Sequence, residues 1–411
     1  MTLPPPIRAS SASSASSASS TTAGSRLAWV LWLVAAASAP AFVGCGGRTL
    51  QLEPDSTLDG GATVDSGAPP PPPPSRTCIE KATAVREPIA ASFSENPLDP
   101  LGYMPFAEDG CGLVYVSKQG RLTRLDFETG EREAIDGSFV RATRPSARDG
   151  VLAWEATDGN GRGVVRVRVG GKEPITIPGA YAKAFEPRVG FDAVVFTFTN
   201  GNPDRADADL DVAVYTPSTG AVAVVGDGPG QQRFGAVGKG FVAYSDFSED
   251  PTGTFSERGP RASDIVVVDL GTKRRTRREA PGKQAFPLLD DDGLLLYTDF
   301  GDIHPEPKFS AYAIKLGKIG SPIGQDRVVH ESPKIGSSTP WIQPSLGRGF
   351  VSWIEGDSRL MRRATSLASP ATKVAESDEG FVGVVDGTLA AFVAARGATR
   401  SEVFLEARKT R

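Results

Sequence analysis

Short apolar segments that follow polar, glycine-bounded turns recur along the chain. Each is four to six residues long and is built mainly from Val, Leu, Ala, Phe and Tyr. Apolar runs of this length between turn residues are typical of buried β-strands and too short for helices. The copies lie at residues 112–116, 150–154, 192–196, 240–244, 293–297 and 349–353, with a weaker one at 387–392.

A second strand with alternating polar and apolar residues follows several of these segments. It ends at a glycine-containing turn and is clearest at residues 122–130, 211–220 and 264–271. Alternation with a period of two directs one face inward, and glycine supplies the positive φ that tight hairpins need. A short polar strand then leads to a proline, at Pro145, Pro187, Pro287 and Pro344. Proline there suits a sheet edge or a crossing between sheets, where no ladder N–H is required.

Residues 77–411 hold about seven copies of about 48 residues each, the length of a four-stranded propeller blade. We therefore predict an all-β fold, a β-propeller with seven blades of four antiparallel strands. Six or eight blades stay open because the last copy is short, and residues near 79–93 could complete it and close the ring. A β-sandwich or two stacked β-domains is the alternative.

One copy carries a more specific pattern. Asp246 follows an apolar strand, and after a loop Ser263 and Asp264 begin an alternating strand that ends in an Asp-Leu-Gly-Thr turn at 269–272. This pattern resembles TolB-like propeller repeats, and residues 210–215 and 299–314 match it in part. The resemblance implies the propeller fold, with the aspartates accepting backbone N–H groups in the loops, and it does not imply an active site.

The N-terminal region has the pattern of an export signal. Arg8 and Arg26 supply positive charge, residues 27–43 are mostly apolar, and small residues precede Cys45. The stretch resembles a bacterial lipoprotein signal. The resemblance implies that residues 1–44 are a signal peptide, that the Cys45 thiol carries a diacyl anchor, and that Gly46 after the cysteine favours the outer membrane. An uncleaved membrane anchor and a simple secreted protein are the alternatives.

Residues 45–76 combine Gly, Asp, Ser and Thr with six consecutive prolines and lack apolar periodicity, so we expect a disordered, extended tether. Docking of the prolines on an aromatic groove is the alternative.

With Cys45 lipidated, Cys78 and Cys111 are the only other cysteines, and in an oxidising compartment we expect them to form a disulfide. Two buried free thiols, or a metal-binding or catalytic cysteine, are the alternatives.

The charge of the chain gives no reason to expect nucleic acid as a partner. The formal net charge is −4, and phosphate binding needs a concentrated basic surface. The one basic run, residues 273–278, reads as a solvated edge strand, since charges on an edge discourage pairing with other sheets. Binding to an anionic glycan or lipid surface is its alternative reading.

No catalytic constellation is visible in the sequence. The chain has two histidines, His304 and His330, and lacks a Gly-x-Ser-x-Gly elbow, so we predict no triad and no cofactor. The oxygen-rich stretch from Asn200 to Asp211 could suit Ca²⁺, but Arg205 stands where a calcium loop needs glycine. A solvated hairpin loop is the preferred reading, and we predict no metal site.

Three long insertions, at residues 200–209, 247–262 and 299–308, fall in consecutive copies and could project from one face of the ring. We predict a monomeric, non-catalytic binding or scaffold module for a protein, peptide or surface polymer. The alternative is a glycan-active propeller enzyme with Asp246 and Asp299 as its carboxylates. The candidate recognition residues are Asp204, Asp207, Asp209, Glu249, Asp250, Glu257, Arg258, Asp302, His304 and Glu306.

Overall fold

The structure is a computed structural model of the 411-residue chain. It describes residues 85–88, 106–109, 112–117, 121–136, 142–201, 209–248, 263–301, 312–332, 344–347, 349–355, 359–376, 381–386, 389–396 and 402–409. The predicted signal peptide, Cys45, the tether, Cys78 and Cys111 lie outside these residues, so those predictions stay predictions. Within the described ranges, no helix is long and apolar enough to cross a membrane.

The described residues form a β-propeller of antiparallel, four-stranded sheets, which confirms the predicted fold class. Six sheets each contain four consecutive strands and are called blades 1 to 6 here. Blade 1 is β2 to β5 (Phe106–Asp109, Gly112–Val116, Leu122–Asp126, Arg132–Ala134), and blade 2 is β6 to β9 (Ala142–Arg148, Val151–Thr157, Gly163–Val169, Ile175–Thr176). Blade 3 is β10 to β13 (Lys183–Val189, Val194–Thr199, Asp211–Thr216, Ala221–Gly226), and blade 4 is β14 to β17 (Gln232–Gly238, Phe241–Asp246, Asp264–Asp269, Arg275–Arg278). Blade 5 is β18 to β21 (Gln284–Leu289, Leu294–Asp299, Tyr312–Lys318, Arg327–Ser332), with a short 3-10 helix at Ile323–Gln325, and blade 6 is β22 to β25 (Ser345–Gly347, Phe350–Glu355, Arg359–Ala364, Thr372–Glu376).

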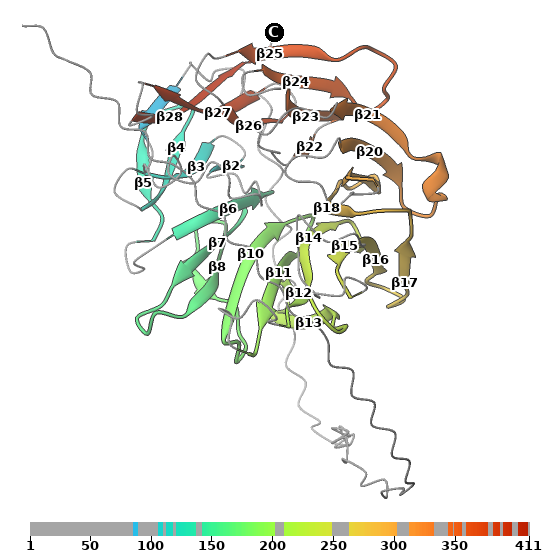
Figure 1. Cartoon of the computed structure of the whole chain (residues 1–411). Coiled ribbons are helices and arrows are strands. Elements are labelled where there is room, and N and C mark those ends of the chain that lie inside the picture. Colours follow the sequence, from blue (N-terminus) through green and yellow to red (C-terminus); the bar gives the residue numbers. More distant parts are fainter. Residues whose placement is uncertain are drawn as a thin grey trace, which may run out of the picture. The chain divides into compact units, whose positions relative to one another are not determined.

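A seventh sheet joins the two ends of the propeller. It holds β26 to β28 (Phe381–Asp386, Leu389–Arg396, Glu402–Lys409) and, as its outermost strand, β1 (Val85–Pro88), which pairs antiparallel with β28. β1 lies inside the stretch that the sequence marked as able to complete the last copy. The first strands of successive blades contact one another from β2 to β26, and the blades follow the chain around the ring (Figure 1).

The apolar segments of the sequence are the second strands of the blades, β3, β7, β11, β15, β19, β23 and β27. In β11 every residue is buried. The sequence repeat therefore begins one strand later than the structural blade. The second strand is the most regularly apolar because it is covered by neighbouring blades on both faces.

Each first strand of blades 2 to 5 contains a β-bulge around a non-glycine residue with positive φ. These residues are Arg144 (52°), Glu186 (56°), Phe234 (59°) and Phe286 (61°). Proline follows three of them, so these prolines lie inside the innermost strands. The sequence analysis expected the prolines at a sheet edge or at a crossing between sheets, and these three lie in edge strands. The bulge residue and the proline after it both lie outside the hydrogen-bond ladder with the second strand. The missing N–H of proline therefore costs the sheet no hydrogen bond.

The hydrophobic core is a series of layers between neighbouring blades. The layer between blades 3 and 4 contains Val195, Val214, Val242 and Val266, and similar layers join blades 1 and 2, 2 and 3, 4 and 5, and 5 and 6. Each fully buried aliphatic side chain contributes about 1.5–3 kcal/mol relative to exposure. The blades therefore depend on their neighbours for stability.

The turns between first and second strands approach one another closely. A Cβ on Gly190 would overlap the carbonyl oxygen of Val237 in the next blade, and one on Gly238 would crowd the carbonyl of Asp290 in the blade after that. Arg148 of blade 2 also forms an ion pair with Asp291 of blade 5, which is not a neighbouring blade. This end of the ring is thus fastened across non-adjacent blades.

We expect Gly190→Ala to destabilise the propeller by about 1–3 kcal/mol, because the added methyl forces the backbone of two blades apart. Chemical denaturation of the purified chain measures the change. Gly159→Ala is the matched control, since a Cβ there meets no atom within 4 Å. Equal effects of the two substitutions would contradict the close inter-blade packing.

Candidate functional site

The three long insertions leave the propeller at the same end of three consecutive blades. Each joins the second strand of its blade to the third: β11 to β12, β15 to β16 and β19 to β20. We call this end the loop face. Of the candidate recognition residues, Asp209 is described and exposed, at the root of the first insertion. The other nine, Asp204, Asp207, Glu249, Asp250, Glu257, Arg258, Asp302, His304 and Glu306, lie outside the described residues.

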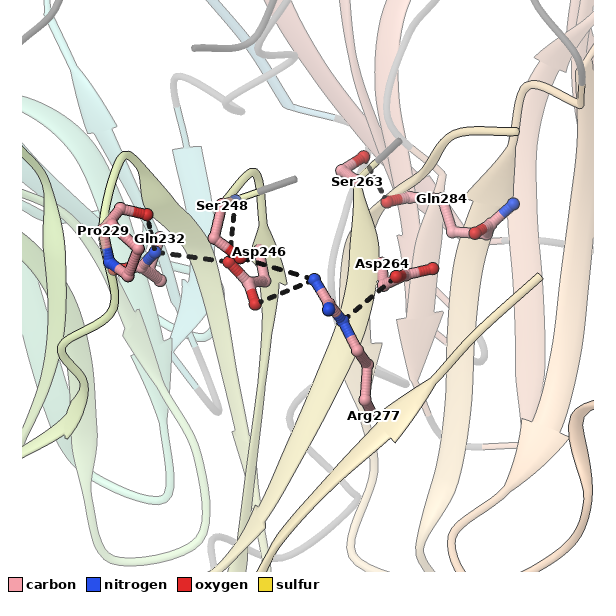
Figure 2. Close-up of polar contacts among 8 residues, drawn as sticks. All are labelled: Pro229, Gln232, Asp246, Ser248, Ser263, Asp264, Arg277 and Gln284. Atoms are coloured by element: carbon pink, nitrogen blue, oxygen red, sulfur yellow. Dashed lines mark hydrogen bonds and ion pairs between the residues drawn. The ribbon is translucent and has the colours of Figure 1, made fainter. Parts of the chain in front are cut away.

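We call the residues where an insertion leaves one strand and enters the next its two roots. Asp246, at the end of β15, fixes the first root of the blade 4 insertion (Figure 2). Its Oδ1 accepts the backbone N–H of Ser248 at 3.0 Å and the Nε2 amide of Gln232 at 3.3 Å. The Gln232 amide also donates to the carbonyl of Pro229 at 3.2 Å. The inner strand β14 therefore fixes the direction in which the chain leaves β15.

Arg277, on the outermost strand β17, joins the two roots of this insertion (Figure 2). One of its terminal nitrogens lies 3.2 Å from Asp246 Oδ2, and its Nε lies 3.0 Å from Oδ2 of Asp264, the first residue of β16. The Asp264 side chain is 6% exposed. One guanidinium thus pairs with both carboxylates that flank the insertion.

The second root is fastened to the next blade. Ser263 Oγ donates to the backbone carbonyl of Gln284 at 2.6 Å, and the N–H of Gln284 returns a bond to the carbonyl of Ser263 at 2.7 Å. At the first root, the N–H of the buried Phe247 donates to the carbonyl of Gln231 at 2.9 Å. Both ends of the insertion are therefore fixed to inner strands.

Blade 5 repeats the arrangement at its own insertion. Gln284 Nε2 donates to the carbonyl of Pro281 at 3.0 Å and to Asp299 Oδ1 at 3.2 Å, and the same oxygen accepts the N–H of Gly301 at 2.9 Å. Lys315 Nζ lies 2.5 Å from Asp299 Oδ2, where blade 4 uses an arginine. The sequence signal for this root is Pro-Gly-x-Gln at 229–232 and 281–284, which the sequence analysis missed.

These contacts give Asp246 and Asp299 a structural role. Each accepts a loop N–H and pairs with a cation, as the resemblance to TolB-like repeats implied. Aspartates at the hairpin turns act in the same way: Asp126 Oδ1 accepts two backbone N–H groups, and its pKa is lowered, chiefly by the bond from Thr129. A pair of free carboxylates for acid and base catalysis is therefore not found at Asp246 and Asp299.

The root of the blade 3 insertion is held by one side-chain hydroxyl and by the backbone. The N–H of Gly201 donates to Thr199 Oγ1 at 3.1 Å, and the carbonyl of the buried Leu210 accepts the N–H of Gln232 at 2.7 Å. Burial, with added repulsion from Asp209 and Asp227, raises the pKa of Asp211 to about 6. The described residues contain no group of three or more metal-ligating side chains, and the interior of the suspected calcium loop lies outside them.

A chain of charged side chains runs along the first and second strands of blades 2 to 4, also unforeseen from the sequence. Arg144 pairs with Glu155 at 2.9 Å, and Glu155 Oε1 accepts the backbone N–H of Glu186 at 2.6 Å. Glu186 in turn pairs with Arg233 and accepts the hydroxyl of Thr197 at 2.9 Å. Three consecutive blades are thus linked by charges at or beside the bulges.

The fully buried Glu186 is ionised. Burial by itself would raise the pKa of this carboxyl, but the charge of Arg233, reinforced by Arg144 and the Thr197 hydroxyl, brings the pKa below its ordinary value of 4.5. Glycosidase acids need the opposite, a raised pKa that keeps the proton at neutral pH. Glu186 therefore suits a structural ion pair rather than a general acid.

The same bulge positions in blades 4 and 5 hold aromatic rings. Phe234 and Phe286 lie with ring centroids 4.6 Å apart, and Phe247 and Phe300 pack against them edge-on. The inner strands therefore change from charged to aromatic between blades 3 and 4, beside the two larger insertions. Phe234, Phe247 and Phe286 are fully buried, so this cluster packs under the strand ends from which the insertions of blades 4 and 5 leave.

The basic run lies where the sequence placed it, on the edge strand β17 and the turn before it. Three of its arginines have acidic partners: Arg275 binds Asp227 at 2.5 Å, Arg277 binds Asp246 and Asp264, and Arg278 binds Asp326 at 2.6 Å. Most of the positive charges of this run are thus paired with acidic residues of the propeller. This weakens the alternative in which the strand binds an anionic glycan or lipid surface.

We expect Arg277→Met to cost about 2–3 kcal/mol, because it leaves the buried Asp264 carboxylate without its cation. The backbone N–H groups of Phe247 and Ser248 should also exchange faster with solvent, since the root of the insertion loses its brace. Hydrogen exchange with peptide-level resolution measures this. Lys315→Met is the matched control and should affect blade 5 only; unchanged exchange in both blades would contradict the bracing role.

No family description matches the chain, and no curated protein matches it. Solved structures share its architecture. The β-propeller domain of the Trilobed protease from Pyrococcus furiosus is 10% identical, with a TM-score of 0.52, covering 74% of this chain and 94% of that domain. The tricorn protease is 11% identical with a TM-score of 0.50, covering 80% of this chain and 35% of its own. TolB from Acinetobacter baumannii is 9% identical with a TM-score of 0.38, covering 73% of this chain and 79% of its own. At such identities the likeness to the first two structures shows the propeller fold alone.

Proposed function

We propose that this protein is a non-catalytic binding or scaffold module that holds a protein, peptide or surface polymer on its loop face. The observation that carries the proposal is the set of three long insertions on consecutive blades, all leaving from one end of the ring. Binding residues commonly lie on loops that a rigid scaffold positions.

The fixed roots support this function. In blade 4, Asp246, Arg277 and Ser263 tie both ends of the insertion to neighbouring strands (Figure 2). Blade 5 repeats the tie at its first root through Asp299. Loops with fixed ends lose less conformational freedom when a partner binds. The opposite end of the ring carries short turns and the Arg148–Asp291 pair. The loop face is therefore the better recognition surface.

The enzyme alternative finds no support at four of the carboxylates that the structure describes. Asp246 and Asp299 hold loop backbones and cations, and Glu155 and Glu186 are paired with arginines. A glycosidase acid needs a raised pKa next to a second carboxylate, and among the described carboxyl groups of this face Asp211, beside Asp209, has a pKa raised to about 6.

Capture from envelope extracts tests the proposed function. The full chain, purified as bait, is compared with a variant in which residues 249–262 and 302–311 are each replaced by an Asn-Gly turn. We expect a partner retained by the native chain to be lost from this variant. Phe191→Ser, in an exposed turn at the opposite end, is the control and should retain the partner. Equal capture by the shortened variant would contradict the proposal.

We further propose that the propeller works at the cell envelope, anchored to the outer membrane by lipid on Cys45. The support is the sequence around Cys45 described above. Cys45→Ser should abolish incorporation of labelled palmitate and release the chain from the membrane fraction. Unchanged labelling or unchanged fractionation would contradict the anchor.

A further inference from the structure

The outermost strand of blade 3 differs from the other outer strands. β13 has the sequence Ala-Val-Ala-Val-Val-Gly, with no charge and no proline. Ala221 and Ala223 are exposed, and Val224 is 49% exposed. An exposed, uncharged sheet edge is a template for pairing with another strand.

The other outer strands that the structure describes are protected in recognised ways. β9 is only two residues long, and β1 carries Arg86, Glu87 and Pro88. The strands β5, β17, β21 and β25 all carry charged residues. A bulge does not distinguish β13, because β21 and β25 also shift register against their neighbours. What distinguishes β13 from the other outer strands is that it carries no charged residue.

We propose that the chain self-associates as a twofold dimer in which β13 of one copy pairs antiparallel with β13 of a second copy. This differs from the monomer expected from the sequence. The pairing extends blade 3 of each copy into one continuous antiparallel sheet. The pairing lies within the stretch that precedes the bulge, Ala221 to Val224, which has regular register with β12, and one of its residues faces its own copy across the axis.

A second copy is the occupant that this edge fits best. Antiparallel pairing about a twofold axis sets the same segment against itself, so the surface must be complementary to itself. Residues 219–226 contain no charged group, so no like charges meet across the axis. At the end of the strand, Asp227 is neutralised by Arg275 at 2.5 Å. The net charge of −4 adds little long-range repulsion between copies.

The expected association is reversible. Pairing of so short a segment buries less surface than a standard stable interface, so the dimer should form at high protein concentration and dissociate on dilution. The edge lies on the outside of the ring, and its first residue, Ala221, lies at the end opposite the loop face. Dimer formation and partner binding on the loop face are therefore separable.

Sedimentation velocity of the full chain in density-matched detergent, over a series of concentrations, tests the proposal. We expect the native chain to move from monomer to dimer as concentration rises. Val224→Lys should shift the midpoint at least tenfold higher, because it places an ammonium group on the pairing edge of each copy. Val224→Thr, uncharged and β-branched, should retain the dimer.

Val328→Lys is the matched control, because Val328 is 40% exposed on the outer strand of blade 5. It should dimerise as the native chain does, and all variants should keep the native far-ultraviolet spectrum. A native chain that stays monomeric throughout would overturn the proposal. A monomeric chain that binds the peptide acetyl-Gly-Ala-Val-Ala-Val-Val-Gly-amide, with loss in Val224→Lys, would overturn it in favour of strand addition by a different partner.

Discussion

Replacing Asp326 by alanine is expected to destabilise the propeller by about 3–5 kcal/mol, because the change leaves the buried Arg278 guanidinium without a counter-charge. Arg278 donates to both carboxylate oxygens of Asp326 at 2.6 Å and to the carbonyl of Ser321 at 2.9 Å. The two side chains are 6% and 1% exposed, and the Tyr297 hydroxyl also donates to Asp326 at 2.8 Å. The network joins blades 4 and 5.

Denaturant unfolding measures this effect, and Asp227→Ala is the matched control. Asp227 pairs with Arg275 from the same strand β17, but the two side chains are 58% and 47% exposed. An exposed pair contributes about 0–1 kcal/mol. The double variant Arg278→Met, Asp326→Leu should recover much of the loss, since apolar residues can replace a buried ion pair. If Asp326→Ala cost no more than Asp227→Ala, the buried network would not be holding the two blades.

Removal of the Glu186 carboxylate is the second large effect. We expect Glu186→Ala to cost about 3–5 kcal/mol, because Arg233 and Arg144 then lose the negative charge between them. Glu133→Ala is the control, since Glu133 is 52% exposed although it pairs with Arg168 at 3.0 Å. A similar small cost for both variants would contradict the role of Glu186 as a link between blades.

The pH dependence of stability separates this charge effect from simple loss of packing. The folded pKa of Glu186 lies below its ordinary value of 4.5, so the unfolded chain binds the proton more readily. The stability that Glu186 contributes is therefore complete above about pH 4.5 and is lost as the pH falls through the folded pKa. The stability difference between the native chain and Glu186→Ala should shrink over that acidic range. A difference independent of pH would mean that the ion pair does not stabilise the fold.

The strands of the ring could be predicted because their signal is local. Each second strand is apolar along its length and bounded by glycine, so residues 240–244 were recognisable as a strand without knowledge of the remaining chain. That residues near 79–93 could complete the last blade and close the ring followed from the short length of the last copy. The first strands were harder, because bulges at Arg144 and Glu186 break their alternation.

The site contacts could not be predicted from local pattern, because they join residues one repeat apart. Arg278 meets Asp326, 48 residues later, and Arg233 meets Glu186, 47 residues earlier. Opposite charges separated by one blade length are visible in the sequence, but many such pairs exist, and only the ring geometry selects those that meet. The aspartates at 246 and 299 were interpreted correctly as structural, since a carboxylate after a strand is suited to accept loop N–H groups.

The most direct test of the loop face as a recognition surface is site-specific photocrosslinking in living cells of the source organism. A benzophenone amino acid replaces Asp209, exposed at the root of the blade 3 insertion, or Phe191, exposed in the turn at the opposite end. We predict a discrete crosslinked product from position 209 and none from position 191. A product from position 191 alone, or none from either position, would contradict recognition through the loop face.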